Sequence, residues 1–370
     1  MGNAGTGFTE KTIGELLDAL EPLKLGASPL GVVPKMAKVR KADVVWVQPK
    51  LVAEVKFAEW THDGHLRAPV YLGLRDDKTA PEVRAERPEK PSRVKLSNLE
   101  KIFWPDERIT KGDLIEYYRS VAAVLVPHLR DRPFTLRRYP DGAFGKAFFQ
   151  KNAPSHMPEW IPRFHTDQFD APVVNDEDAL LWTVNMGCID MNTWYSRVDK
   201  PDRPDFVLFD LDPSDDVGFK ETVQVALLVK AALDALGLVC FPKTSSADGM
   251  HVLVPVERRY TFDQTREFSE IVAGAIARTH RGLATTEWSK SKRRGVLIDS
   301  NQNGEGKTIA SAYSVRPRAG APVSTPLCWD EVDDKLDPSA FTMDVVLERV
   351  RALGDLFAGV LTTKQRLKTP

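Results

Sequence analysis

The stretch Phe206-Val-Leu-Phe-Asp-Leu-Asp-Pro213 decides how this chain is organised. It is a short apolar run typical of a strand, and it ends in two acids one residue apart, Asp210 and Asp212. Because side chains alternate between the faces of a strand, both acids are expected to point the same way, with Leu211 turned into the core. Two like charges on one face repel unless a cation lies between them, and Mg²⁺ or Mn²⁺ is the usual one. A solvated turn after the strand is the alternative reading.

A second apolar run, Gly295-Val-Leu-Ile-Asp299, also delivers an acid at its end. Three carboxylates on neighbouring strands would form a two-metal site for phosphoryl or nucleotidyl transfer. The alternative is that Asp299 only begins a turn with Asn301 and Asn303.

Several residues near these acids are of types that bind phosphate. The segment 243–251 is a polar turn with hydroxyls and a glycine, which can cradle phosphate or can simply be a hairpin loop. Arg293, Arg294 and Arg316 bracket the Asp299 strand, and the guanidinium fork suits phosphate, although a single surface arginine is usually solvated.

Two further pairs are candidates for binding a nucleic acid. Phe148 and Phe149 lie between Lys146 and Lys151 and are expected on opposite faces of a strand, one in the core and one exposed. The exposed one would suit stacking on an unpaired base; the alternative is that both are core or interface residues. Lys101 and Lys111 flank an apolar turn and would suit a terminal phosphate, or they are ordinary surface lysines.

Composition limits the class of protein. The 370 residues allow two or three domains, and 42% hydrophobic with 28% charged residues is ordinary for a soluble globular protein. The net charge of −1 requires any phosphate-binding surface to be local. The chain has neither a long apolar run nor a signal peptide, which predicts a protein with no membrane segment. Cys188, Cys240 and Cys328 are widely separated, which indicates reduced core residues in the cytoplasm.

The residue pattern changes along the chain and predicts a mixed, α+β fold. Residues 1–85 combine a helix over 9–20 with short strands, which suits a small β-barrel of the OB type. Residues 79–94 are rich in proline and charge, and we place a linker at 86–94. Residues 95–370 predict a mixed central sheet flanked by helices. The predicted strands are 133–139, 206–212, 238–241, 251–256 and 295–299; the predicted helices are 110–126, 219–236, 263–280 with Asp263 as cap, and 341–361.

Many of these residues belong to motifs of a known family. Residues from about Lys95 to Val332 resemble the polymerase domain of bacterial DNA ligase D, of the archaeo-eukaryotic primase superfamily, which works in non-homologous end joining. The matching motifs, in order, are K-I-F-W-P (101–105), T-K-G-D-L-I-E-Y-Y (110–118), R-P-F-T-L-R-R-Y-P-D-G (132–142), F-F-Q-K (148–151), V-N-M-G-C-I-D (184–190), R-P-D-F-V-L-F-D-L-D-P (203–213) and D-S-N-Q-N (299–303). The first 85 residues resemble the carboxy-terminal OB domain of the ligase part, through G-T-G-F (5–8), 45–61 and 66–78.

The resemblance implies a template-dependent nucleotidyltransferase, of polymerase or primase type, that fills and extends broken DNA ends with NTP or dNTP. It implies two Mn²⁺ or Mg²⁺ ions held by the catalytic acids Asp210, Asp212 and Asp299. The other implied roles are nucleotide binding by Ser245, His251, Arg294 (with Arg293 as the alternative), Gln302 and Arg316; binding of the DNA 5′-phosphate by Lys101 and Lys111; template stacking by Phe148 and Phe149; and a remnant of the last ligase motif in Arg67, Arg75, Asp76 and Lys78.

The implied partners are double-strand-break ends with a 5′-phosphate, Ku protein and possibly a separate ligase chain, at the nucleoid of a bacterial cytoplasm. The turn at 243–251 departs from the family pattern, because Asp248 stands where a lysine is usual. No D-G pair is preceded by the lysine of a K-x-D-G motif, so nick sealing by this chain alone is not expected. A non-catalytic DNA-end-binding module of a split or truncated ligase D is the alternative function.

Overall fold

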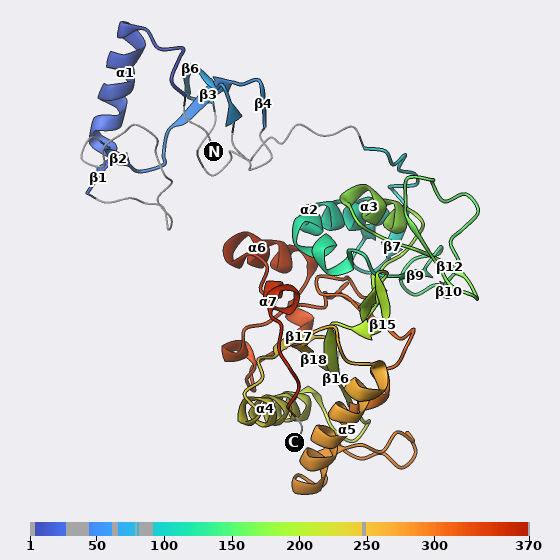
Figure 1. The fold of residues 1–370 in the computed structure, drawn as a ribbon. Helices are drawn as coiled ribbons and strands as arrows, with labels where there is room; N and C mark the ends of the chain where they lie inside the picture. Colours follow the sequence, from blue (N-terminus) through green and yellow to red (C-terminus); the bar gives the residue numbers. More distant parts are fainter. Residues whose placement is uncertain are drawn as a thin grey trace. The chain divides into compact units, whose positions relative to one another are not determined.

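The computed structural model describes residues 4–26, 44–60, 66–77, 80, 92–245 and 249–368 (Figure 1). Lys78 and Asp248 lie outside these described residues, as does most of the predicted linker. The chain divides into two compact units, Met1–Ser92 and Arg93–Pro370, and each is described by itself. No helix within the described ranges is both long enough and apolar enough to cross a membrane.

The described residues of the first unit form one α-helix and three short ladders. Helix α1 (Glu10–Leu20) begins after Thr9, which caps it, as predicted, and runs into the 3₁₀ turn η1 (Glu21–Leu23). The ladders are antiparallel and join β1 (Lys24–Leu25) to β2 (Trp46–Val47), β3 (Val52–Lys56) to β6 (Val70–Arg75), and β4 (Glu59–Trp60) to β5 (Leu66–Arg67). Over the described residues these ladders do not close into a barrel, so the predicted OB fold is not confirmed.

The G-T-G-F motif has a steric role in this unit. The Phe8 ring stacks on Tyr71 with centroids 4.7 Å apart, and the backbone N–H of Tyr71 donates to the Thr6 carbonyl. Gly7 has a φ of +94°, and a Cβ there would lie 2.1 Å from the Tyr71 carbonyl oxygen. Only glycine fits so close an approach in this conformation.

The second unit is built on a five-stranded mixed sheet. Its strand order is β17-β18-β16-β20-β19, antiparallel throughout except for the parallel pair β19 and β20. The strands are β16 (Phe206–Pro213), β17 (Phe241–Thr244), β18 (Met250–Pro255), β19 (Ala284–Thr285) and β20 (Val296–Asp299). The predicted mixed α/β class is therefore confirmed. Strand β16 is central because 206–209 is apolar on both faces and fully buried.

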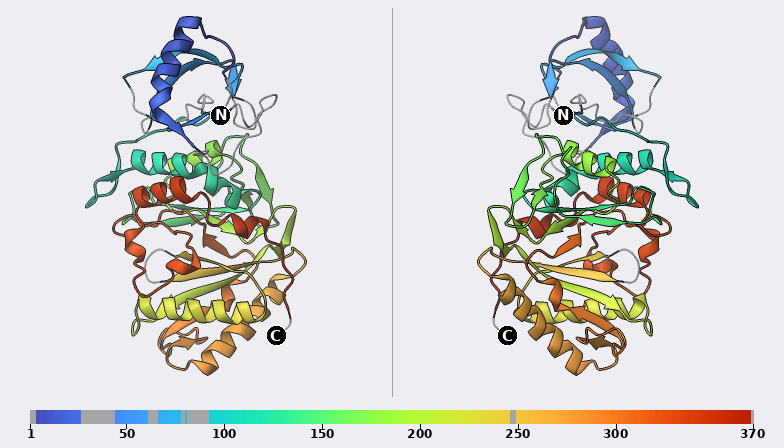
Figure 2. Two further views of the ribbon diagram at one scale, coloured as in Figure 1. Left: turned by 90° about the vertical axis from the view of Figure 1, so that its left-hand side faces the viewer. Right: turned by 90° about the vertical axis from the view of Figure 1, so that its right-hand side faces the viewer.

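A four-stranded sheet and the helices complete the second unit. Figure 2 shows α2 and α6 at one end, α4 and α5 at the other, and the sheets between them. The second sheet has the order β10 (Phe148–Gln150), β9 (Phe134–Arg138), β13 (Asn192–Trp194) and β21 (Thr308–Ala310). The helices are α2 (Lys111–Leu129), α3 (Glu177–Asn185), α4 (Phe219–Ala235), α5 (Phe262–Thr279), α6 (Met343–Leu353) and α7 (Ala358–Thr362). The smaller elements are β7 (Ile102–Trp104), β8 (Ile109–Thr110), β11 (Arg163–His165), β12 (Asp170–Pro172), β14 (Ser196–Arg197), β15 (Lys200–Pro204), η4 (Ser300–Gln302), η5 (Trp329–Glu331) and η6 (Pro338–Ala340).

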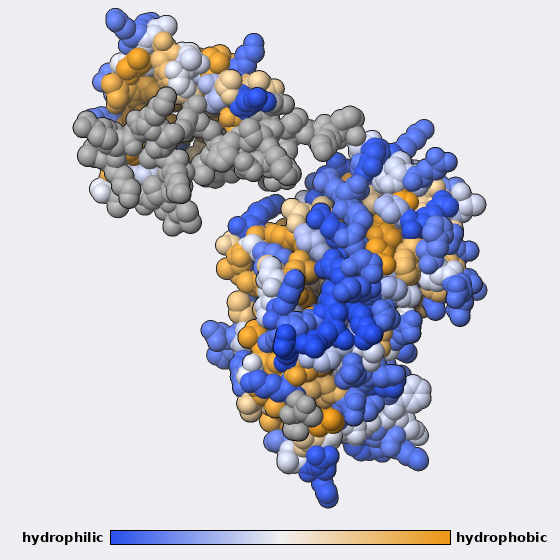
Figure 3. Space-filling model, in the orientation of Figure 1, coloured by the Kyte–Doolittle hydropathy of each residue, from blue (hydrophilic) through white to orange (hydrophobic). Residues whose placement is uncertain are grey.

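The apolar residues of this unit are largely enclosed. The face that Figure 3 shows is mostly hydrophilic over the second unit, with apolar residues in smaller separate areas. The core runs continuously from α2 through both sheets to α4 and α5, and β16 contributes Val207, Leu208, Phe209 and Leu211 to it. The central strand is thus fixed by burial on both faces.

Several predicted boundaries are wrong, each for a local reason. No strand forms over 238–240, because the Gln365 side chain takes both the N–H and the C=O of Val239. Helix α5 is capped by Thr261 rather than Asp263, since the Thr261 hydroxyl accepts from Gln264 N. The predicted helix 341–361 is divided at Gly354, which has a φ of +71°.

The three cysteines are free, but only two of them are core residues. Cys188 and Cys240 are buried as predicted. Cys328 is exposed at the start of η5, where its backbone N–H donates to Glu331.

Asn303 supports the central strand where its neighbour ends. After Asp299 the chain leaves the sheet through η4, so β20 does not pair with β16 at Leu208. The side-chain amide of Asn303 takes the place of a paired strand at this residue. Its Oδ1 accepts from Leu208 N at 2.8 Å, and its Nδ2 donates to Leu208 O at 2.7 Å. The side chain is 1% exposed, so both backbone groups would be buried without it.

We expect Asn303→Leu to lower the free energy of unfolding of the second unit by about 2–4 kcal/mol, since two buried backbone groups lose their partners. Denaturant titration measures this as a lower midpoint. The control is Asn301→Ala, at an exposed position of the same turn, which should stay within about 0.5 kcal/mol of wild type. An unchanged midpoint for Asn303→Leu would show that Asn303 does not support β16.

Candidate active site

Four polar residues form one row across the five-stranded sheet. Lys243 on β17 is opposite His251 on β18, His251 is opposite Asp210 on β16, and Asp210 is opposite Asp299 on β20. Opposed residues of neighbouring strands project to the same face. The register therefore places His251, a predicted nucleotide-binding residue, in one row with Asp210 and Asp299, two of the predicted metal-binding acids.

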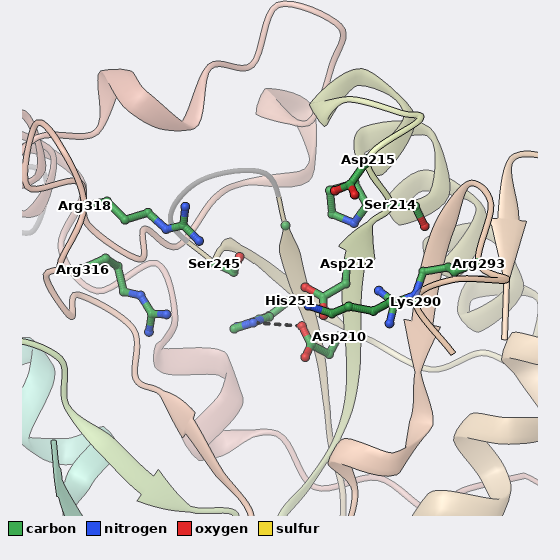
Figure 4. Close-up of a pocket in the computed structure, with 12 residues that line it drawn as sticks. Asp210, Asp212, Ser214, Asp215, Ser245, His251, Lys290, Arg293, Arg316 and Arg318 are labelled. Atoms are coloured by element: carbon green, nitrogen blue, oxygen red, sulfur yellow. Dashed lines mark ion pairs between the residues drawn. The ribbon is translucent and has the colours of Figure 1, made fainter. Parts of the chain in front are cut away.

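A polar cavity of about 450 Å³ opens at this row. Figure 4 shows Asp210 and Asp212 projecting from β16 into it, with Arg316 and Arg318 on one side and Lys290 and Arg293 on the other. Its lining is Asp210, Asp212, Pro213, Ser214, Asp215, Ser245, Gly249, His251, Lys290, Arg293, Arg316 and Arg318. Acids that face several cations in one hollow suit an anionic ligand that carries a metal ion.

Ser245 and Gly249, which flank residues 246–248 outside the described ranges, lie close to the end of β16. Ser245 N donates to the Gly249 carbonyl at 3.0 Å. A Cβ on Gly249 would lie 2.7 Å from Ser245 Oγ and 2.8 Å from the Leu211 carbonyl. Gly249 therefore lets Ser245 approach the acids.

The ionised forms of the three acids are unfavourable here, because burial raises the pKa of each. Burial raises the pKa of Asp210 to about 6, although Lys243 and Arg316 oppose this. Burial, followed by the charge of Asp210, raises the pKa of Asp212 to about 6. Burial also raises the pKa of Asp299, against a hydrogen bond from Asn301 N. A divalent cation would relieve this accumulation of negative charge.

The fit to a metal rests on the chemistry of the donors. Carboxylate oxygens are the ligands that Mg²⁺ and Mn²⁺ prefer. In the part of the chain that the structure describes, no three His, Cys, Asp or Glu side chains are already gathered as a metal cage. Asp210 Oδ1 is 3.2 Å from His251 Nε2, and Asp299 Oδ1 accepts from Asn301 N at 2.9 Å.

Of the predicted nucleotide-binding residues, Ser245, His251 and Arg316 line the cavity, whereas Gln302 and Arg294 do not. Arg294 lines a separate hollow and donates to the Arg293 carbonyl. Arg293, the alternative, is in the cavity, and its buried Nε has no hydrogen-bond partner among the described residues.

Two cations of the cavity, Lys290 and Arg318, were missed by the sequence reasoning. Lys290 belongs to the basic run Lys290–Arg294, and Arg318 follows Arg316 by two residues. Closeness to Arg316 in the sequence was the only signal for Arg318, because 316–318 forms a tight turn in which Arg318 N donates to the Arg316 carbonyl at 2.8 Å. Lys290 and Arg318 both line the cavity with the acids.

The two predicted 5′-phosphate residues lie side by side at the start of α2. The Lys111 backbone N–H donates to the Lys101 carbonyl at 2.8 Å. Lys101 is partly exposed beside Asp141, whereas Lys111 is buried and donates from Nζ to Ser97 O and Asn185 Oδ1. Burial, followed by the charge of Lys101, lowers the pKa of Lys111.

Phe148 and Phe149 are both exposed, at 42% and 64%, on the edge strand β10, so the prediction that one of them is in the core is wrong, as is the alternative that both are. Arg138 lies over the Phe148 ring and Arg137 over the Phe149 ring, each at 5.2 Å. Two adjacent aromatic faces backed by cations are available for stacking on bases.

The predicted ligase-motif residues are in the first unit. Arg67 is on β5, Arg75 ends β6 and forms an ion pair with Asp77, and Asp76 follows it. Lys78 lies outside the described residues.

Comparison with known proteins defines the class of the second unit. The structure superimposes on a solved "Polymerase Domain from Mycobacterium tuberculosis Ligase D in complex with DNA", with a TM-score of 0.69, 30% identity, and coverage of 73% of this chain and 98% of that one. The fold is thus that of a polymerase domain of this type.

The family follows from the sequence matches. The model of "LigD, primase-polymerase domain" matches residues 110–357, and that of "ATP dependent DNA ligase C terminal region" matches residues 1–78. The chain belongs to the LigD primase-polymerase domain family. It is 32% identical to the "Multifunctional non-homologous end joining protein LigD" of Pseudomonas aeruginosa, over 99% of this chain and 46% of that protein. It is 31% identical to the "Bifunctional non-homologous end joining protein LigD" of Bacillus subtilis, over 83% of this chain and 51% of that protein. The chain therefore spans about half the length of these relatives.

We expect Asp210→Asn to stabilise the metal-free protein at pH 8 and not at pH 4. The pKa of Asp210 is about 6 in the folded chain and about 4 when unfolded, so the folded state binds the proton more tightly. Its favourable contribution is complete below pH 4 and is lost as the pH rises through 6. Two pKa units correspond to about 2.7 kcal/mol, so the variant should melt roughly 5–10 °C above wild type at pH 8.

Thermal unfolding with EDTA between pH 4 and pH 8 measures this difference, and Mn²⁺ should remove it by stabilising only the wild type. A constant difference across the pH range would contradict the raised pKa.

Proposed function

We propose that the chain is a metal-dependent nucleotidyltransferase that fills and extends broken DNA ends with NTP or dNTP, directed by a template. The observation that carries this proposal is the cross-strand row His251, Asp210 and Asp299, which opens into a cavity lined with cations. The family and the DNA-bound solved relative support the same chemistry.

Asp210, Asp212 and Asp299 would hold two Mn²⁺ or Mg²⁺ ions, which supply Lewis-acid chemistry at the attacking 3′-hydroxyl and the leaving pyrophosphate. The chain's own residues bind and orient the triphosphate. Arg293, Lys290 and Arg316 offer positive charge at the cavity wall, and Ser245 offers a hydroxyl. We assign the nucleotide role to Arg293 in place of Arg294 because only Arg293 lines the cavity.

The DNA end would be bound away from the acids. Lys101 and Lys111 are the candidates for a 5′-phosphate, because a backbone hydrogen bond joins the two residues and the Lys101 side chain is exposed. Phe148 and Phe149 offer exposed rings for the template. The connection to the cavity is Asp190, which is buried and accepts from Arg137, the arginine over Phe149, at 3.1 Å. Asp190 also lies 3.6 Å from Arg316, which lines the cavity.

We propose that the first unit is the OB-fold domain of a ligase. Its last motif would consist of Arg67, Arg75, Asp76 and Lys78. A linker at 86–94 would join it to a polymerase domain over 95–370. The match to the ligase C-terminal region supports this assignment. Ku protein, a separate ligase chain and a place at the bacterial nucleoid follow from the same hypothesis.

We expect Asp210→Ala to lower primer extension at least 100-fold on a gapped duplex with a 5′-phosphate and Mn²⁺, because ion positioning supplies several kcal/mol of the catalysis. Gel-based extension with NTP and dNTP measures it. The control is Asp202→Ala, an exposed acid on β15, which should keep wild-type activity. Equal activity of Asp210→Ala and wild type would refute the proposal.

Binding measurements with the DNA end and with NTP separate the alternative function. A chain that binds the 5′-phosphorylated end but shows no metal-dependent binding of NTP would be a non-catalytic end-binding module.

We expect Lys101→Ala to weaken binding to a gap with a 5′-phosphate about three- to tenfold and to leave binding to a 5′-hydroxyl gap unchanged, since one partly exposed cation contact is lost. Fluorescence anisotropy with both DNAs measures this selectivity. Lys220→Ala, at an exposed position on α4, is the control. An equal loss on both DNAs would place the 5′-phosphate elsewhere.

A further inference from the structure

The buried lysine of the cross-strand row has no role in the functions assigned above. Lys243 is 1% exposed and is among the largest fully buried side chains of the described chain. Burying an ammonium group is costly unless each of its N–H groups finds an acceptor.

Each N–H of Lys243 has one acceptor. Nζ is 3.0 Å from the Ala310 carbonyl, 2.6 Å from Ser324 Oγ and 2.7 Å from His251 Nδ1. The Ala310 carbonyl can only accept. The Ser324 hydroxyl donates its own hydrogen to the Thr244 carbonyl at 2.7 Å, so it presents a lone pair to Nζ.

The third N–H then determines the tautomer of His251. If Nζ donates to Nδ1, that nitrogen carries no hydrogen, and the single proton of a neutral ring is on Nε2. Nε2 lies 3.2 Å from Asp210 Oδ1. The opposite arrangement, with Nδ1–H donating to Nζ, would set the bare Nε2 against a carboxylate oxygen, which is repulsive.

The electrostatic environment agrees with a neutral ring. Burial, followed by the charges of Lys243 and Arg316, lowers the pKa of His251 well below its usual range. Burial and Arg316 also lower the pKa of Lys243, while Asp210 raises it, and the three acceptors favour its ammonium form.

We propose that Lys243 is a positioning residue which, through its hydrogen bond to Nδ1, keeps the Nε2–H of His251 directed into the cavity as a donor to the phosphates of the incoming nucleotide. This inference deepens the proposed function and rests on it. With Nδ1 occupied by the hydrogen bond from Lys243, the ring carries its proton on Nε2 and cannot present a lone pair there to an anion.

The test is Lys243→Met in the full chain, which keeps the length of the side chain and removes its donors. Long-range ¹H–¹⁵N NMR of the histidine rings reads the tautomer directly and needs no nucleotide. In the wild type, His251 should show a bare Nδ1 and a protonated Nε2; in the variant, it should show a mixture of tautomers. KM for NTP should rise about tenfold, the effect of one charge-assisted hydrogen bond, and kcat should change less than about threefold.

Two further variants separate positioning from folding. Ser324→Ala removes one acceptor of Nζ without touching His251 and should shift the tautomer and KM in the same direction, by about threefold in KM. Thr265→Val is the matched control: the residue is buried on α5 and loses its hydroxyl bond to the Phe262 carbonyl, but that hydroxyl has no hydrogen bond to Lys243, Ser324 or His251, so the tautomer should stay as in wild type.

A folded Lys243→Met protein with the wild-type tautomer and KM would overturn the proposal. If that variant does not fold, Ser324→Ala with wild-type values would overturn it. If the wild type binds no NTP, the proposed function fails separately, and the tautomer alone decides the role of Lys243: a change in Lys243→Met supports it and no change refutes it.

Discussion

The register of β16 against its two neighbours is the constraint on which the site depends. Pairing places Asp210 between His251 and Asp299, and alternation places Leu211 in the core. A slip of one residue would exchange the two faces, burying the acids and exposing leucine. The run 206–209 is apolar on both faces and would tolerate such a slip, so the alternation of Asp210, buried Leu211 and Asp212, together with the two hydrogen bonds between Asn303 and Leu208, fixes the register.

Polar side chains hold this strand at its start and along one edge. Before it, Asp205 receives two hydrogen bonds from the buried Arg132, at 2.7 and 2.8 Å. Alongside it, Asn303 satisfies both backbone groups of Leu208. These contacts hold the acids in a position that is electrostatically unfavourable without a cation, which is the usual cost of a site prepared for a ligand.

The buried charges of the second unit do not all form separate ion pairs, because one carboxylate can face two arginines. Asp190 is fully buried and faces both Arg137 and Arg316, so one carboxylate orients an arginine under the exposed ring of Phe149 and another at the cavity. Lys243 and His251 are hydrogen-bonded to each other, and the charge of Arg316 acts on both. Asp190 therefore connects the cavity, through Arg316, to the aromatic edge, through Arg137.

The sequence by itself determined the strand-borne acids, the helices α1, α2, α4 and α5, the mixed sheet and the family, because these follow from local periodicity and from motifs contiguous in the chain. Only the tertiary structure decided which arginine enters the cavity, that Phe148 and Phe149 are both exposed, and that Gln365 replaces a strand at Val239. It also decided that Lys243, which reads as the first residue of a polar turn, is buried beneath His251. Such features depend on contacts between segments far apart in the chain, about which the spacing of neighbouring residues carries no information.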